Sequence, residues 1–158
     1  MKYKKALSLW LGVLLLLTVS ASLHGCDDLM DKKLTVGGYG SEHEGVSLRI
    51  VSADLSGKYL TIDTRWSNET DHAVTYGAWF RVERLQDGEW VDCATSDVSF
   101  IEIAYLFEAN SSQNQTYSME HFRIKRQGTY RLTTECYLQL EEAPERCGLW
   151  VEFTLTDS

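Results

Sequence analysis

The sequence lacks the patterns that mark common catalytic and metal sites. It has no G-x-S-x-G, H-E-x-x-H or C-x-x-C spacing and no phosphate-cradling glycine loop. His43, His72 and His121 are dispersed, without carboxylates or cysteines at the short spacing that metal sites use. Glu141, Glu142 and Glu145 are most simply a solvated turn, and nothing indicates paired carboxylates for glycoside cleavage. We therefore expect no enzymatic activity, no catalytic residue, no metal site and no cofactor.

Basic residues are scarce. The chain has 15 Lys and Arg residues against 23 Asp and Glu residues, which gives a formal net charge of −8. Nucleic-acid phosphates are bound by Lys and Arg side chains, so this balance argues against a nucleic-acid partner. It also disfavours adhesion to anionic lipid head groups.

The 3.6-residue period of an amphipathic helix is also missing. From Val46 onward apolar residues alternate with polar ones, as in half-buried strands, and Asp87-Gly88 is a hairpin signal. Val, Ile, Thr and aromatic residues dominate these segments. Eight strands are predicted, at 46–51, 59–66, 74–85, 89–93, 100–107, 115–124, 129–140 and 147–156. Seven or eight strands at this spacing indicate an all-β antiparallel sandwich of two sheets.

The one long apolar run lies at the N-terminus. Lys2, Lys4 and Lys5 precede an apolar stretch that ends near Leu17 and passes into small and polar residues. Positive charge before a short apolar segment is typical of an export signal. The alternative is a retained transmembrane helix.

The residues Leu23-His24-Gly25-Cys26 resemble a bacterial lipoprotein box, although His24 departs from its pattern. The resemblance implies lipidation of the Cys26 thiol and cleavage before it, so 1–25 would be a lipoprotein signal peptide. Cleavage would leave 133 residues and, with three lysines lost, a charge of −11. The mature protein would be anchored to the cell membrane on its extracytoplasmic side. The alternative is ordinary cleavage near Ala21, which would leave Cys26 as a spare thiol.

A glycine-containing polar segment follows Cys26. It is charged, carries Gly37, Gly38 and Gly40, and lacks apolar periodicity. These features predict a flexible tether over 26–44 and a folded domain over 45–158.

Three further cysteines would lie outside the cytosol, where disulfides persist. Cys136 and Cys147 share inward parity on consecutive strands, so a cross-strand bond between them is feasible. Pairing of Cys93 with either one, or no bond at all, stays open.

Several spaced motifs resemble a bacterial immunoglobulin-like domain family that is common on exported lipoproteins. Tyr76-Gly77-x-x-Phe80-x-Val82-Glu83 and Asp87-Gly88-x-Trp90 carry the resemblance. Tyr105-Leu106, 128–132 and 152–155 continue it, so that it spans about 45–156. The family implies an immunoglobulin-like sandwich and no general enzymatic role. The chain departs from the family pattern in lacking a proline before Gly128 and in having its three cysteines.

In such a sandwich the strands at 74–85, 129–140 and 147–156 would be neighbours in one sheet. Parity then places on the outer face of this sheet the five side chains of a candidate binding face, Trp79, Arg81, Arg131, Tyr137 and Trp150, together with Glu83, Glu135 and Glu152. Aromatic rings rimmed by charges on an exposed sheet are typical of a binding surface. The alternatives are that a loop or the tether covers the rings, or that the register slips by one residue. Trp66 and Trp90 are assigned to core or hairpin packing.

These features predict a non-enzymatic, membrane-tethered binding module outside a bacterial cytoplasmic membrane. Its partner would be a protein or a cell-wall component, bound by a sheet face or by loops at one end of the sandwich. The alternative is a structural or accessory subunit that stabilises or regulates a neighbouring envelope complex.

Overall fold

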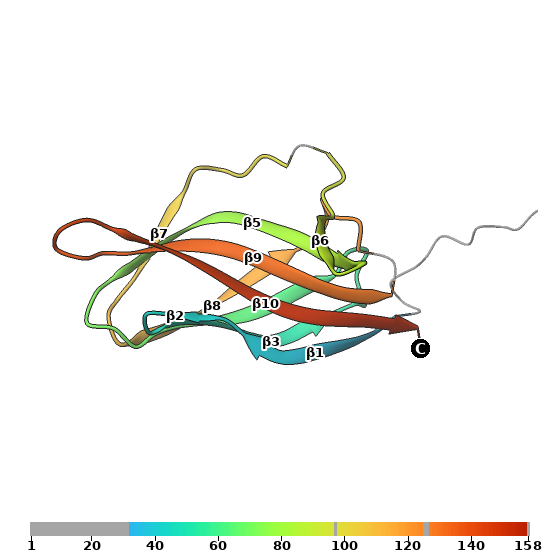
Figure 1. The fold of residues 1–158 in the computed structure, drawn as a ribbon, viewed down its shortest axis with the longest axis horizontal. Coiled ribbons are helices and arrows are strands. Elements are labelled where there is room, and N and C mark those ends of the chain that lie inside the picture. Colours follow the sequence, from blue (N-terminus) through green and yellow to red (C-terminus); the bar gives the residue numbers. More distant parts are fainter. Residues whose placement is uncertain (1–31, 97, 125–126, 158) are drawn as a thin grey trace, which may run out of the picture.

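A computed structural model describes residues 32–96, 98–124 and 127–157. Within these ranges the secondary structure consists of ten β-strands without a helix (Figure 1). The strands are β1 (Lys32–Gly40), β2 (Glu42–His43), β3 (Val46–Asp54), β4 (Thr61–Asn68), β5 (Val74–Gln86), β6 (Glu89–Asp92), β7 (Ala104–Phe107), β8 (Ser111–Ser118), β9 (Gly128–Leu138) and β10 (Glu145–Asp157).

The strands form two antiparallel sheets. One has the order β1-β10-β9-β5-β6, with β7 paired to the other end of β5, and the second has the order β2-β3-β4-β8. The two sheets pack face to face, which confirms the predicted all-β sandwich. The two strands beyond the eight expected are β1 and β2, which come from the segment predicted as a tether.

The core lies between the sheets and follows from the period-two pattern. On β9 the residues Tyr130, Leu132, Thr134 and Cys136 are fully buried, while the alternate residues 131, 133 and 135 are only half-buried. Trp66 of β4 is also fully buried, as predicted, and stacks on Tyr76 at 4.9 Å between ring centroids. Burying one large apolar side chain of this kind contributes about 1.5–3 kcal/mol.

The predicted hairpin at Asp87-Gly88 is confirmed. Gln86 pairs with Glu89, which leaves a two-residue turn between β5 and β6. Both turn residues have positive φ, 51° for Asp87 and 87° for Gly88, as this kind of turn requires.

The prediction of a flexible tether over 26–44 is wrong for the part that the structure describes. Strand β1 pairs with β10 from Lys32 opposite Asp157 onward, and β2 pairs with β3. Gly40 does not indicate flexibility, because a Cβ there would lie 1.9 Å from the carbonyl oxygen of Leu48. The glycine permits a close approach between β1 and β3, so the folded domain begins by Lys32 rather than at residue 45. Cys26 lies outside the described residues.

Leu34 offers a direct test of this strand. Its side chain is half-buried and packs against the core, whereas the neighbouring Thr35 is exposed. We expect Leu34→Ala to lower the free energy of unfolding by about 1–2 kcal/mol, because apolar contacts are lost. Thr35→Ala should change it by less than about 0.5 kcal/mol. Urea denaturation measures the free energy of unfolding of both variants. Equal, negligible effects would indicate that this segment is a tether and not a strand of the folded domain.

Candidate binding face

The outer face of the six-stranded sheet carries the five side chains that parity predicted. Trp79 is 39% exposed and Tyr137 is 42% exposed, and the Arg81 side chain is also largely exposed. Arg131 and Trp150 are half-buried on the same face. Their neighbours along the strands, such as Leu132 and Val151, point into the core. The placement therefore follows the expected register, and the binding role of the five residues stays a prediction.

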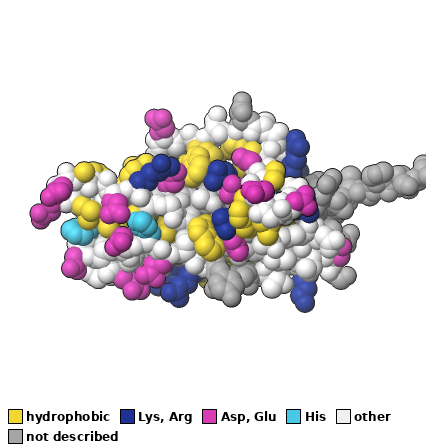
Figure 2. Space-filling view, viewed as in Figure 1, with side chains coloured by type: hydrophobic (Ala, Val, Ile, Leu, Met, Phe, Trp, Pro, Cys, Tyr) yellow, Lys and Arg dark blue, Asp and Glu magenta, His cyan; other side chains and the backbone are white. Residues whose placement is uncertain are grey.

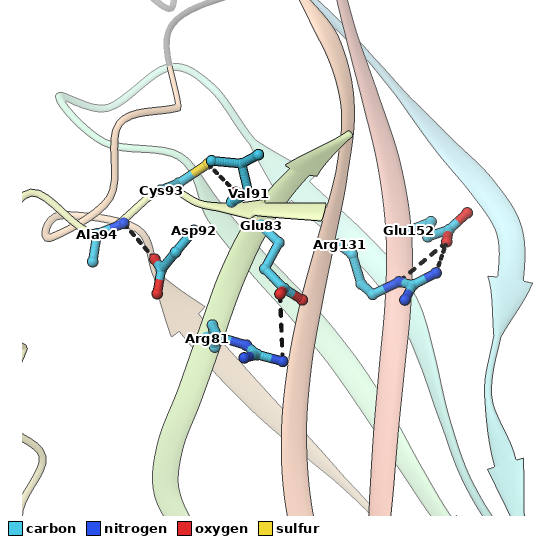
Figure 3. A network of polar contacts seen from close by, with 8 residues as sticks. All are labelled: Arg81, Glu83, Val91, Asp92, Cys93, Ala94, Arg131 and Glu152. Carbon is cyan, nitrogen blue, oxygen red and sulfur yellow. Dashed lines mark hydrogen bonds and ion pairs between the residues drawn. The ribbon is translucent and has the colours of Figure 1, made fainter. Parts of the chain in front are cut away.

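Arg131 is held between two tryptophans. Its guanidinium lies 4.0 Å from the ring centroid of Trp90 and 4.6 Å from that of Trp150. The Nε and Nη2 atoms both donate to Oε1 of Glu152, at 3.2 and 2.8 Å (Figure 3). Trp90 was assigned to core or hairpin packing, and the structure places it on β6 against the outward Arg131. These contacts link β6, β9 and β10, so Arg131 and Trp150 are engaged within the protein.

Arg81 and Trp79 border a small recess. Arg81 forms an ion pair with the nearly buried Glu83 at 3.4 Å (Figure 3). The recess has a volume of about 300 Å³ and lies between β5 and the segment that follows β6, with Phe100 and Asp92 among its lining residues. Phe100 was predicted to begin a strand, but the paired strand β7 starts only at Ala104.

An apolar strip crosses this face at the other end of β5. We define it as Trp79, Leu106 and Tyr137. Leu106 of β7 pairs with Thr75, which pairs in turn with Tyr137 of β9, so Leu106 and Tyr137 share one row across the three strands. Trp79 is exposed further along β5. Leu106 is 59% exposed. Figure 2 shows hydrophobic side chains interspersed with basic and acidic ones over β5, β9 and β10.

Sequence reasoning did not assign Leu106 to this face. The strand at 100–107 was expected, but its pairing beside the first residues of β5 cannot be read from alternation. Charge rims the strip at Glu135 and Arg146, where the Arg146 Nε donates to Oε2 of Glu135 at 3.0 Å.

Cys136 and Cys147 lie directly opposite each other on β9 and β10, and both are buried. All three described cysteines are free thiols. Burial raises the pKa of the Cys136 thiol, and the neighbouring Cys147 raises it further. The backbone N–H of Cys93 donates to the carbonyl of Val82. Val82 pairs with Leu132, which lies four residues before Cys136 on β9. This separation of roughly 13 Å exceeds the reach of a disulfide.

Two of the three described histidines each contact a single carboxylate rather than a cluster. His43 Nε2 lies 3.1 Å from Glu145 Oε1, and His121 Nε2 lies 3.1 Å from Glu120 Oε1. Among the residues that the structure describes, no group of three or more His, Cys, Asp or Glu residues is placed to hold a metal ion. None of the described segments forms a helix long and apolar enough to cross a membrane.

The two-sheet sandwich and its motifs define an immunoglobulin-like class of domain. The family model of the bacterial Ig-like domain matches residues 42–152, and the chain therefore belongs to this family. No match was found among curated proteins.

Two solved structures are similar over most of their length. A crystal structure of an Archaeoglobus fulgidus protein has 9% identity and a TM-score of 0.38, covering 80% of this chain and 94% of that one. An X-ray structure of a Northeast Structural Genomics Consortium target has 10% identity and a TM-score of 0.40, covering 82% and 88%.

The opposed cysteines lead to a prediction about oxidation. Under oxidising conditions we expect one disulfide, between Cys136 and Cys147, detected by peptide mapping of the unreduced protein. Closing this short loop should stabilise the fold by about 3 kcal/mol in the chain-entropy model. The Cys136→Ser variant should melt at a lower temperature than the oxidised wild type. A disulfide that involves Cys93 would contradict the β9–β10 register, which places Cys136 opposite Cys147.

The role of Arg131 is tested by removing its charge. We expect Arg131→Met to lower the free energy of unfolding by about 1–2 kcal/mol, because two cation–π contacts and the Glu152 ion pair are lost. The free energy of unfolding of Arg131→Lys should lie between those of the wild type and Arg131→Met, since an ammonium does not reproduce the planar guanidinium. Arg49→Met, at an exposed position on β3, is the matched control and should change stability by less than about 0.5 kcal/mol. Equal effects of Arg131→Met and Arg49→Met would show that the stacking is not stabilising.

Proposed function

We propose that this chain is a non-enzymatic binding module, held by a lipid on Cys26 at the extracytoplasmic side of a bacterial cytoplasmic membrane. Membership of the bacterial Ig-like family is consistent with a non-catalytic interaction role. The partner is a protein of the cell envelope, and the surface that contacts it is the apolar strip.

The observation that carries this proposal is the exposure of the strip. Leu106, Tyr137 and Trp79 are 59%, 42% and 39% exposed on one face. Aromatic and aliphatic side chains gathered in this way, with charges at the rim, are favoured at the centre of protein interfaces. A sheet face is flat, which suits a protein surface better than a small ligand.

The engagement of Arg131 and Trp150 narrows the proposed contact. The two side chains are already packed against each other, and Arg131 is also paired with Glu152. Their contribution would be to hold β9 and β10 rigid beneath the strip. Of the five residues predicted as a face, Trp79 and Tyr137 remain for direct contact, and Arg81 lies at the edge.

The position of β1 supports a short anchor. Lys32 pairs with Asp157 at the end of the sandwich, six residues after Cys26. Six extended residues span at most about 20 Å. A lipidated Cys26 would therefore keep this end close to the bilayer, with the outer face of the sheet turned sideways towards neighbouring envelope proteins.

Site-specific photo-crosslinking in living cells tests the surface. A photo-reactive amino acid at position 106 should trap a partner, whereas one at position 51 should not. Val51 is the matched control, because it is also 59% exposed but lies on β3 of the other sheet. Equal trapping from both positions, or none from 106, would contradict the proposal.

A double variant tests the side chains themselves. Trp79→Ser with Leu106→Ser should keep the thermal stability of the wild type within a few degrees, since both residues are exposed, and should abolish partner capture from envelope extracts. Val51→Ser should retain capture.

The identity of what is trapped separates this function from its alternatives. A single stoichiometric membrane protein would favour the accessory subunit, which stabilises or regulates one complex. Capture by isolated wall material would favour adhesion to a cell-wall component.

A further inference from the structure

A second recess lies at the end of the sandwich where β1 begins, away from the apolar strip. It has a volume of about 730 Å³, within the range of small-molecule sites. Its walls come from the turn before β4, the β5–β6 hairpin, the residues after β6 and the segment after β8. We call it the end pocket.

The inner wall of the end pocket is apolar. Leu60 is fully buried, and Met119 and Ile124 are each 2% exposed. Phe122 and Cys93 complete this wall, and burial raises the pKa of the Cys93 thiol to about 11. The thiol is therefore protonated at neutral pH and adds an uncharged surface. Such a wall accepts a hydrocarbon group.

The lining of the end pocket carries three basic side chains against two acidic ones, Asp92 and Glu120. The basic ones are Lys58, Arg84 and Arg123. Arg84 Nη2 donates to the carbonyl of Gln127 at 2.8 Å, and its Nε is buried with no hydrogen-bond partner. Among the described residues, neither Lys58 nor Arg123 forms an ion pair.

The two acidic side chains that line the pocket, Asp92 and Glu120, already have partners within the protein. Asp92 Oδ1 accepts the N–H of Ala94 at 2.7 Å (Figure 3), and Glu120 lies against His121. Lys58 lies over the ring of Tyr59 at 4.9 Å and Arg84 donates to Gln127, but both side chains carry further N–H donors beyond these contacts. An anionic group is the ligand chemistry that these donors fit.

We infer that the end pocket binds a small anionic amphiphile, with its hydrocarbon against Leu60, Met119 and Phe122 and its phosphate or carboxylate near Arg84, Lys58 and Arg123. This site goes beyond the proposed partner surface and does not depend on it. The ligand is either a membrane phospholipid, reached because the pocket and the start of β1 share one end, or a soluble fatty-acid-like molecule.

Calorimetric titration of the full chain carrying Cys26→Ser tests this site, because no acyl chain of its own then competes. The probe is n-decyl phosphate below its micellar concentration. We expect saturable binding at one site, at least tenfold tighter than that of n-decanol or inorganic phosphate, since each lacks one half of the amphiphile.

Variants show whether the probe binds in the pocket. Lys58→Met with Arg123→Met should weaken binding about tenfold or more, and exposed Arg49→Met, away from the pocket, should leave it unchanged. Lys58 and Arg123 are exposed, so the double variant should keep the wild-type melting temperature. Absence of binding, equal binding of decanol or phosphate, or equal binding by the double variant would overturn the inference.

A second probe identifies the source of the ligand. Dihexanoylphosphatidylglycerol has the same anionic chemistry on two chains. Binding of both probes supports a membrane phospholipid as the ligand, and binding of decyl phosphate alone supports a soluble single-chain amphiphile.

Discussion

The register of β5, β9 and β10 is the constraint on which the rest of the structure depends. Glu83 pairs with Arg131, and Arg131 pairs with Glu152, so the three strands present one continuous row of outward side chains. A slip of one residue would exchange the two faces, bringing Arg131 into the core and Leu132 into solvent. The free energy of burying the inward residues therefore holds the outward ones in place.

The outer face that this register creates has two parts with different roles. Around Arg131, tryptophan rings and the Glu152 carboxylate enclose the guanidinium and stiffen the sheet. Around Thr75, β7 adds Leu106 to the row that contains Tyr137, and these side chains stay exposed. A rigid half beside an exposed apolar half is the arrangement from which we propose partner binding. The end pocket lies at the end of the same sandwich where β1 begins.

Much of this fold is predictable from the sequence, because one buried face imposes a period of two. The two-sheet sandwich, the Asp87-Gly88 turn and the outward parity of Trp79 and Tyr137 follow from local patterns. What local patterns miss is non-local. Gly40 suggested a tether, but it allows a backbone contact with Leu48. Trp90 finds its partner, Arg131, two strands away. The end pocket brings together 58–60, 84–95, 119–124 and Tyr130, and alternation carries no information about how these distant parts of the chain converge.

Hydroxyl-radical footprinting of the full chain tests most directly whether the apolar strip is a contact surface. Oxidation of Trp79, Leu106 and Tyr137 in intact cell envelopes is compared with oxidation in the purified protein, with Val51, exposed on β3 of the other sheet, as the reference. We predict that the three strip residues are protected in the envelope while Val51 is oxidised equally in both samples. Equal oxidation of the strip in both samples would contradict a partner at this face.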